Sequence, residues 1–170
     1  LFFQYPLELI LNRYSNVAIA ITHLFTLGIV AMMMLGALQQ MLPVLAGVVI
    51  KKPIVFANIV HISLTLGTLG LSGGFLYSSN ILLIAGAIFL SISFGLFLFT
   101  VAFLLFKVKY LTATVNAMKI FIMAAIVTIL VGLYLVTAHI TSDITSLHYS
   151  IVTIHILFAI FGFVLILIMG

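Results

Sequence analysis

Histidine is the residue type in this sequence best suited to hold a transition metal or to exchange a proton near neutral pH. The chain has five histidines, no cysteine and only two acidic residues. The lack of cysteine excludes thiolate ligation of haem, cysteine-held iron–sulfur clusters and covalent haem attachment. The histidines are His23, His61, His139, His148 and His155. Which of them could act together depends on the segments that carry them.

The composition of these segments is that of a membrane protein. Hydrophobic residues make up 66% of the 170 residues and charged residues 5%, whereas soluble domains are about half apolar and a quarter charged. So few charges cannot cover the surface of a soluble globule. We therefore expect an integral membrane protein whose first partner is the lipid bilayer. The composition argues against nucleic-acid binding, disorder and a secreted disulfide scaffold.

Long apolar stretches separated by short polar turns predict about five spanning segments of the ~20 residues that cross a bilayer. Alternation with a period of two is absent, so the expected fold is all-α: one polytopic transmembrane helix bundle. The segment 1–15 should lie along the headgroups. Because the sequence starts without an initiator methionine and stops inside an apolar run, we expect it to be part of a longer polypeptide, or a processed or incompletely observed one. The expected spans are 16–45, 54–77, 81–106, 112–138 and 147–170.

The lysines predict the orientation of these spans. Five lysines follow the first and third spans or begin the fourth, whereas the opposite side carries a single arginine, Arg13. Because cytoplasmic loops are rich in Lys and Arg, the lysine side should be cytoplasmic and the N-terminus outside. A bacterial inner membrane is the expected location. The five are Lys51, Lys52, Lys107, Lys109 and Lys119.

Two histidines should lie at similar depth inside the spans. At 1.5 Å per residue, His23 and His155 each lie roughly 10–12 Å in from the outer side. His148 precedes His155 by one heptad, His61 lies near the midplane, and His139 ends the fourth span as a solvated interface residue. An ionisable side chain inside a span is usually functional. The simpler alternative is an imidazole hydrogen-bonded to a neighbouring helix.

Haem is the metal group that two such imidazoles suit best. Zinc normally takes a third or fourth ligand, and the only carboxylates, Glu8 and Asp143, lie outside the spans. Haem iron needs only two axial ligands. We therefore expect haem b held by His23 with His155 or His61.

Other ligands receive less support from the residues. His148 is a further candidate metal ligand. The thioethers of Met32, Met33 and Met34 could coordinate iron, although methionines in a spanning helix are commonly packing residues. Copper is an alternative metal for which the residues give no separate support.

Glycines in the spans favour haem binding, whereas a row of polar residues in the second span favours a different function. Gly28, Gly67 and Gly70 leave helix faces that would admit a macrocycle, although such faces also serve helix contact. His61, Thr65, Thr68 and Ser72 follow at intervals of four, three and four, which places them on one helix face pointing into the bundle. They could line a path in a non-haem transporter. A structural or assembly subunit of a respiratory complex is a further alternative.

The first span also carries a recognisable motif. Thr22-His23-Leu24-Phe25-Thr26-Leu27-Gly28, with Gly36 and Pro43 further on, resembles the His–Leu–x–x–Leu–Gly … Gly–x–x–x–x–x–x–Pro helix of the haem–copper oxidase subunit I superfamily. The similarity is to its small or divergent cbb3-type subunit-I-like and NnrS-like members. It implies haem binding by His23 and a role in electron transfer or in haem, copper or nitric oxide handling. Other membrane subunits or copies of the chain would be partners.

One departure from the superfamily pattern limits the activity that the resemblance implies. Catalytic members of the superfamily have an adjacent histidine pair, and this sequence has no His-His dipeptide. We therefore assign no catalytic residue and expect oxidoreductase activity only within a larger assembly.

The last span also resembles the first in its glycine spacing, because Gly162 and Gly170 are eight residues apart, as Gly28 and Gly36 are.

Overall fold

A computed structural model describes residues 12–108, 112–142 and 146–169. These residues form helices joined by turns and include no strand. The all-α prediction is therefore confirmed. Most of the predicted headgroup segment 1–15, with Glu8, lies outside the described residues, as do Lys109, Asp143 and Gly170.

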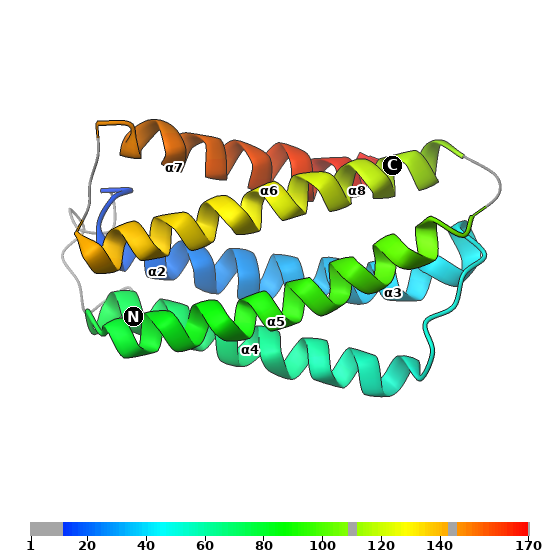
Figure 1. Cartoon of the computed structure of the whole chain (residues 1–170), viewed down its shortest axis with the longest axis horizontal. Helices are drawn as coiled ribbons and strands as arrows, with labels where there is room; N and C mark the ends of the chain where they lie inside the picture. The colour runs from blue at the N-terminus through cyan, green and yellow to red at the C-terminus, as the bar shows by residue number, and fades with distance from the viewer. Residues whose placement is uncertain (1–11, 109–111, 143–145, 170) are drawn as a thin grey trace. The chain divides into compact units, whose positions relative to one another are not determined.

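Five stretches of helix among the described residues are long and apolar enough to cross a membrane. This confirms the expected integral membrane protein of about five spanning helices. Their bounds are Asn16–Leu45, Pro53–Leu76, Asn80–Leu105, Ala113–Thr141 and His148–Met169. Figure 1 labels them as α2 (Asn16–Phe25) and α3 (Met32–Leu45), α4 (Pro53–Leu76), α5 (Asn80–Leu105), α6 (Ala113–Thr141), and α7 (His148–Leu157) with α8 (Ile166–Met169).

The first and last spans differ from the plain helices expected for them. A π-helical segment, η1 (Thr26–Ala31), lies between α2 and α3, and a second, η2 (Phe158–Leu165), lies between α7 and α8. A π-helix has i→i+5 hydrogen bonds and so changes which face the following residues occupy. Such segments are often found at functional sites.

Local capping residues set where two of the spans begin. Ser15 Oγ accepts a hydrogen bond from the Ala18 N–H at 3.1 Å, and Thr112 Oγ1 accepts one from the Val115 N–H at 3.2 Å. Both bonds satisfy a backbone donor that a helix start leaves without an internal acceptor.

The chain divides into two compact units, and long helices contribute to both. Unit 1 comprises residues 1–33 and 58–94, so its described part holds α2, η1, most of α4 and the first half of α5. Unit 2 comprises residues 34–57 and 95–170 and holds most of α3, the second half of α5, and α6 to α8.

Glycines bring α4 and α5 close together in unit 1. A Cβ added at Gly86 would lie 2.3 Å from the Leu71 backbone nitrogen, and one at Gly70 would lie 3.0 Å from the Gly86 Cα. A Cβ at Gly67 would lie 2.8 Å from atoms of Leu90. The faces of Gly67 and Gly70, which the sequence analysis assigned to a cofactor, are therefore covered by α5. These two glycines serve helix contact.

Small residues also bring α6 against the last span in unit 2, where the two run antiparallel (Figure 1). A Cβ added at Gly162 would lie 2.5 Å from the Ala124 Cβ. One turn away, the Phe121 and Phe163 rings pack with centroids 5.0 Å apart. This contact positions His155 against α6.

Candidate functional site

His23 lies in unit 1 with its imidazole held by its own helix. The Nδ1–H donates to the Ile19 carbonyl oxygen at 2.8 Å, and the ring stacks on Phe75 with centroids 6.2 Å apart. A carbonyl oxygen can only accept, so Nδ1 carries the proton and the lone pair of the neutral imidazole lies on Nε2. This is the tautomer that ligates a metal through Nε2.

His155 lies in unit 2 and reaches the neighbouring helix. Its Nδ1–H donates to the Thr128 carbonyl oxygen at 3.0 Å. The ring rests in a notch at Gly132, where an added Cβ would lie 3.0 Å from the His155 Cε1. The simpler alternative considered for an intramembrane histidine, a hydrogen bond to another helix, is thus present here. This hydrogen bond also places the lone pair of the neutral His155 imidazole on Nε2, as in His23.

The two histidines occupy the same place in two similar elements. Each is the eighth residue of a ten-residue α-helix, and a π-helical segment begins three residues later. In both, the backbone N–H of the residue that opens the π-segment, Thr26 or Phe158, donates to the histidine carbonyl. The sequence echo between the first and last spans is therefore also an echo in backbone structure, although the glycines follow at different distances.

The other three histidines have different surroundings. His61 is exposed on α4, and its carbonyl accepts a hydrogen bond from Thr65 Oγ1 at 2.8 Å. His139 is half-buried near the end of α6. His148 is the first residue of α7, and its ring contacts that of Tyr149 edge-on with centroids 5.9 Å apart. His23 and His61 belong to unit 1, and the other three histidines belong to unit 2.

The predicted polar stripe on α4 divides in the structure. His61 is exposed and Thr65 half-buried, whereas Thr68 and Ser72 are each only 2% exposed. Thr68 Oγ1 and Ser72 Oγ have no hydrogen-bond partner among the described residues. Gly28 of η1 lies beside Thr68, because an added Cβ would meet the Thr68 methyl at 3.6 Å. Only the buried half of the stripe, Thr68 and Ser72, therefore points into unit 1.

No group of three or more His, Asp or Glu side chains gathers in a metal-binding arrangement within the part of the chain that the structure describes. A site with three or four such ligands is therefore not seen there. The criterion does not bear on haem, which takes two axial ligands. Among the three consecutive methionines, Met33 is 70% exposed and Met34 lines an apolar groove between α3, α6 and α8.

Sequence reasoning missed Thr128 and Gly132, the α6 residues that hold His155. Both lie on one helix face four residues apart, and the small residue Ala124 lies one turn further along. That spacing of small residues was the available signal. It is common in membrane helices and does not indicate which helix packs there.

The chain was compared with protein families, curated proteins and solved structures. No protein-family model, curated protein or solved structure matches the chain. The resemblance to the haem–copper oxidase subunit I superfamily stays a prediction that rests on the motif around His23.

Proposed function

We propose that this integral membrane protein binds haem b, with His23 as one axial ligand and His155 or His61 as the candidate for the second, in the manner of the haem–copper oxidase subunit I superfamily. It would act in electron transfer or in haem, copper or nitric oxide handling. When bound, the haem supplies an iron that accepts and releases one electron. Other membrane subunits or further copies of the chain would supply the electron donor and acceptor.

The observation that carries this proposal is the hydrogen bond from Nδ1 of His23 and of His155 to a backbone carbonyl. Metal-ligating histidines commonly donate their second ring N–H to a carbonyl or carboxylate, which fixes the ring and the tautomer. The chemistry of the donor set also fits, because haem iron accepts neutral imidazole nitrogen. In this proposal Ile19 and Thr128 are positioning residues, since their carbonyls orient the two rings.

The lysine distribution completes the proposed setting. We place the protein in a bacterial inner membrane with its N-terminus outside and its lysine-rich connections in the cytoplasm. The proposed haem then lies in the outer half of the membrane.

A visible spectrum of the purified protein tests haem binding directly. Protein from haem-replete cells should show Soret and α bands in the reduced-minus-oxidised spectrum, and its haem should be extractable into acidified acetone because the chain has no cysteine to attach it. A spectrum without these bands from fully folded protein would refute the proposal.

The buried hydroxyls of α4 favour a second candidate function, a proton path. Thr68 Oγ1 and Ser72 Oγ are held inside unit 1 without a hydrogen-bond partner among the described residues. Several other hydroxyls in these helices donate to a carbonyl of their own helix, as those of Thr65, Ser91 and Thr128 do. A buried polar group without a partner is costly, so its presence can reflect a role in moving protons.

Proton flux into vesicles tests this second candidate. In vesicles that contain the protein and a pH-sensitive dye, the double variant Thr68→Val, Ser72→Ala should conduct at least about tenfold less than wild type under an imposed potential. Its melting temperature should not fall, because the lost hydroxyls make no hydrogen bond within the described part of the chain. Equal flux in the variant, or no flux above that of empty vesicles, would exclude the path.

A further inference from the structure

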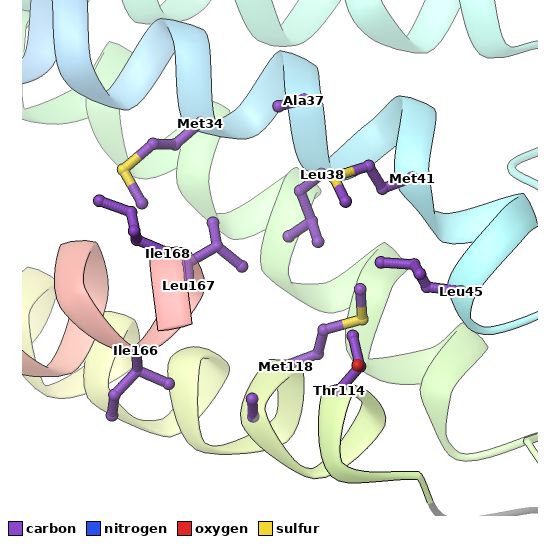
Figure 2. Close-up of a pocket in the computed structure, with 11 residues that line it drawn as sticks. Met34, Ala37, Leu38, Met41, Leu45, Thr114, Met118, Ile166, Leu167 and Ile168 are labelled. Carbon is purple, nitrogen blue, oxygen red and sulfur yellow. The ribbon is translucent and has the colours of Figure 1, made fainter. Parts of the chain in front are cut away.

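Unit 2 contains an apolar groove between α3, α6 and α8 that no part of the proposed haem site uses. Its volume is about 340 Å³. Methionines line both sides, Met34 and Met41 on α3 and Met118 on α6, and Ile168 on α8 lies beside Met34 (Figure 2). Thr114 is the only lining residue with a side-chain oxygen or nitrogen. The groove therefore suits a flexible hydrocarbon chain.

The groove has the length and position of one leaflet of the membrane. Along α3 it extends from Met34 to Leu45, which is roughly 16 Å at 1.5 Å per residue. Half of the ~30 Å hydrocarbon core is about the same length. Leu45 ends α3, and Thr114 is the second residue of α6. This end of the groove therefore lies close to a membrane surface, and the other end lies close to the midplane.

The shallow end of the groove lies at the cationic end of the unit. All four described lysines belong to unit 2. Lys51 and Lys52 follow α3 and Lys107 follows α5, and these two connections lie at the same end of the unit (Figure 1). Lys119 is half-buried on α6 beside the groove residue Met118.

These cations have no protein anion to neutralise them among the described residues, which include no Asp or Glu. A half-buried lysine inside a span is costly unless its ammonium reaches water or an anion at the interface. Phosphate at the depth of the headgroups meets that need, and basic clusters at helix ends attract anionic lipids. The combination is an apolar groove one leaflet long whose shallow end lies at the end of unit 2 where the lysine-bearing segments lie.

We infer that unit 2 binds one anionic phospholipid of the lysine-side leaflet. One acyl chain occupies the groove between α3, α6 and α8, and the phosphate is held by lysines at its shallow end, with Lys119 contributing from within the span. The inference is independent of the proposed haem function, because it uses none of the five histidines.

Native mass spectrometry of the full chain in detergent tests this site. The protein is given phosphatidylglycerol and phosphatidylcholine of identical chains in equal amounts. Wild type should retain one phosphatidylglycerol at least about fivefold more than phosphatidylcholine, and Lys119→Gln should lower that preference about fivefold. Ala117→Leu, which fills the groove, should lower retention of both lipids. Arg13→Gln, which changes a cation of unit 1, and Asn116→Leu, which places the same leucine at an exposed neighbour outside the groove, should behave as wild type.

Thermal melting of each variant shows that it is folded, and Ala37→Leu fills the groove from α3 if Ala117→Leu does not fold. Equal retention of the two phospholipids would overturn the inference. Phospholipid retention that stays unchanged in Ala117→Leu or in Ala37→Leu would also overturn the inference. So would a mass spectrum in which the protein retains a second copy of the chain or an isoprenoid quinone in place of the phospholipid.

Discussion

Replacing His23 with alanine is expected to remove the haem bands from the purified protein. The substitution deletes the Nε2 that the proposal assigns to iron and the Nδ1–H that donates to the Ile19 carbonyl. Loss of the hydrogen-bond partner of a metal-ligating histidine commonly lowers metal affinity about 10- to 100-fold, so loss of the ligand itself should lower haem content by at least about 100-fold. The measurement is the Soret absorbance per mole of protein.

Two controls separate ligation from a structural effect of this change. His148→Ala should retain the full spectrum, because His148 lies at the start of α7. Imidazole added to folded His23→Ala protein during haem loading should restore part of the Soret band by supplying the missing nitrogen. Full haem content in His23→Ala would show that the ligand assignment is wrong.

His155→Ala extends the same measurement to the candidate second ligand. If one haem iron takes both imidazoles, this variant should bind haem with the high-spin spectrum of a single axial histidine. An unchanged low-spin spectrum would remove His155 from the ligand set and leave it with its hydrogen bond to Thr128.

Replacing Gly86 with alanine is expected to destabilise the protein more than any other single methyl addition at a described glycine. The new Cβ would lie 2.3 Å from the Leu71 backbone nitrogen and 2.8 Å from the Gly70 carbonyl carbon. Backbone atoms cannot rotate away, so α4 and α5 must separate. Overpacking of this kind costs about 1–3 kcal/mol, and the separation also loosens the contact between Gly67 and Leu90. The higher helix propensity of alanine returns at most about 1 kcal/mol.

Gly95→Ala is the matched control, because Gly95 lies on the same helix and an added Cβ there meets nothing within 4 Å. Its melting temperature in detergent should equal or slightly exceed that of wild type, whereas that of Gly86→Ala should fall clearly below it. Equal melting temperatures for the two variants would show that α4 and α5 do not pack as closely as described.

The sequence by itself determined the elements of this protein. Runs of apolar residues with almost no charges identified all five spans, and the described helices begin and end within about three residues of the expected bounds. Bilayer thickness demands a minimum length, and the absence of water demands helical hydrogen bonding, so length and composition suffice for this step. The same reasoning singled out His23, His61 and His155 as histidines inside the predicted spans.

Only the tertiary structure decided which faces of those helices meet. It showed that α5 covers Gly67 and Gly70, that His61 is exposed, and that His155 donates to Thr128. It also showed the π-segments that follow His23 and His155. The spans are apolar on nearly every face, because lipid tails and a protein interior are equally apolar surroundings. A membrane helix therefore carries no hydrophobic pattern that marks its buried side, and close packing of small residues and interhelical hydrogen bonds choose its neighbours instead.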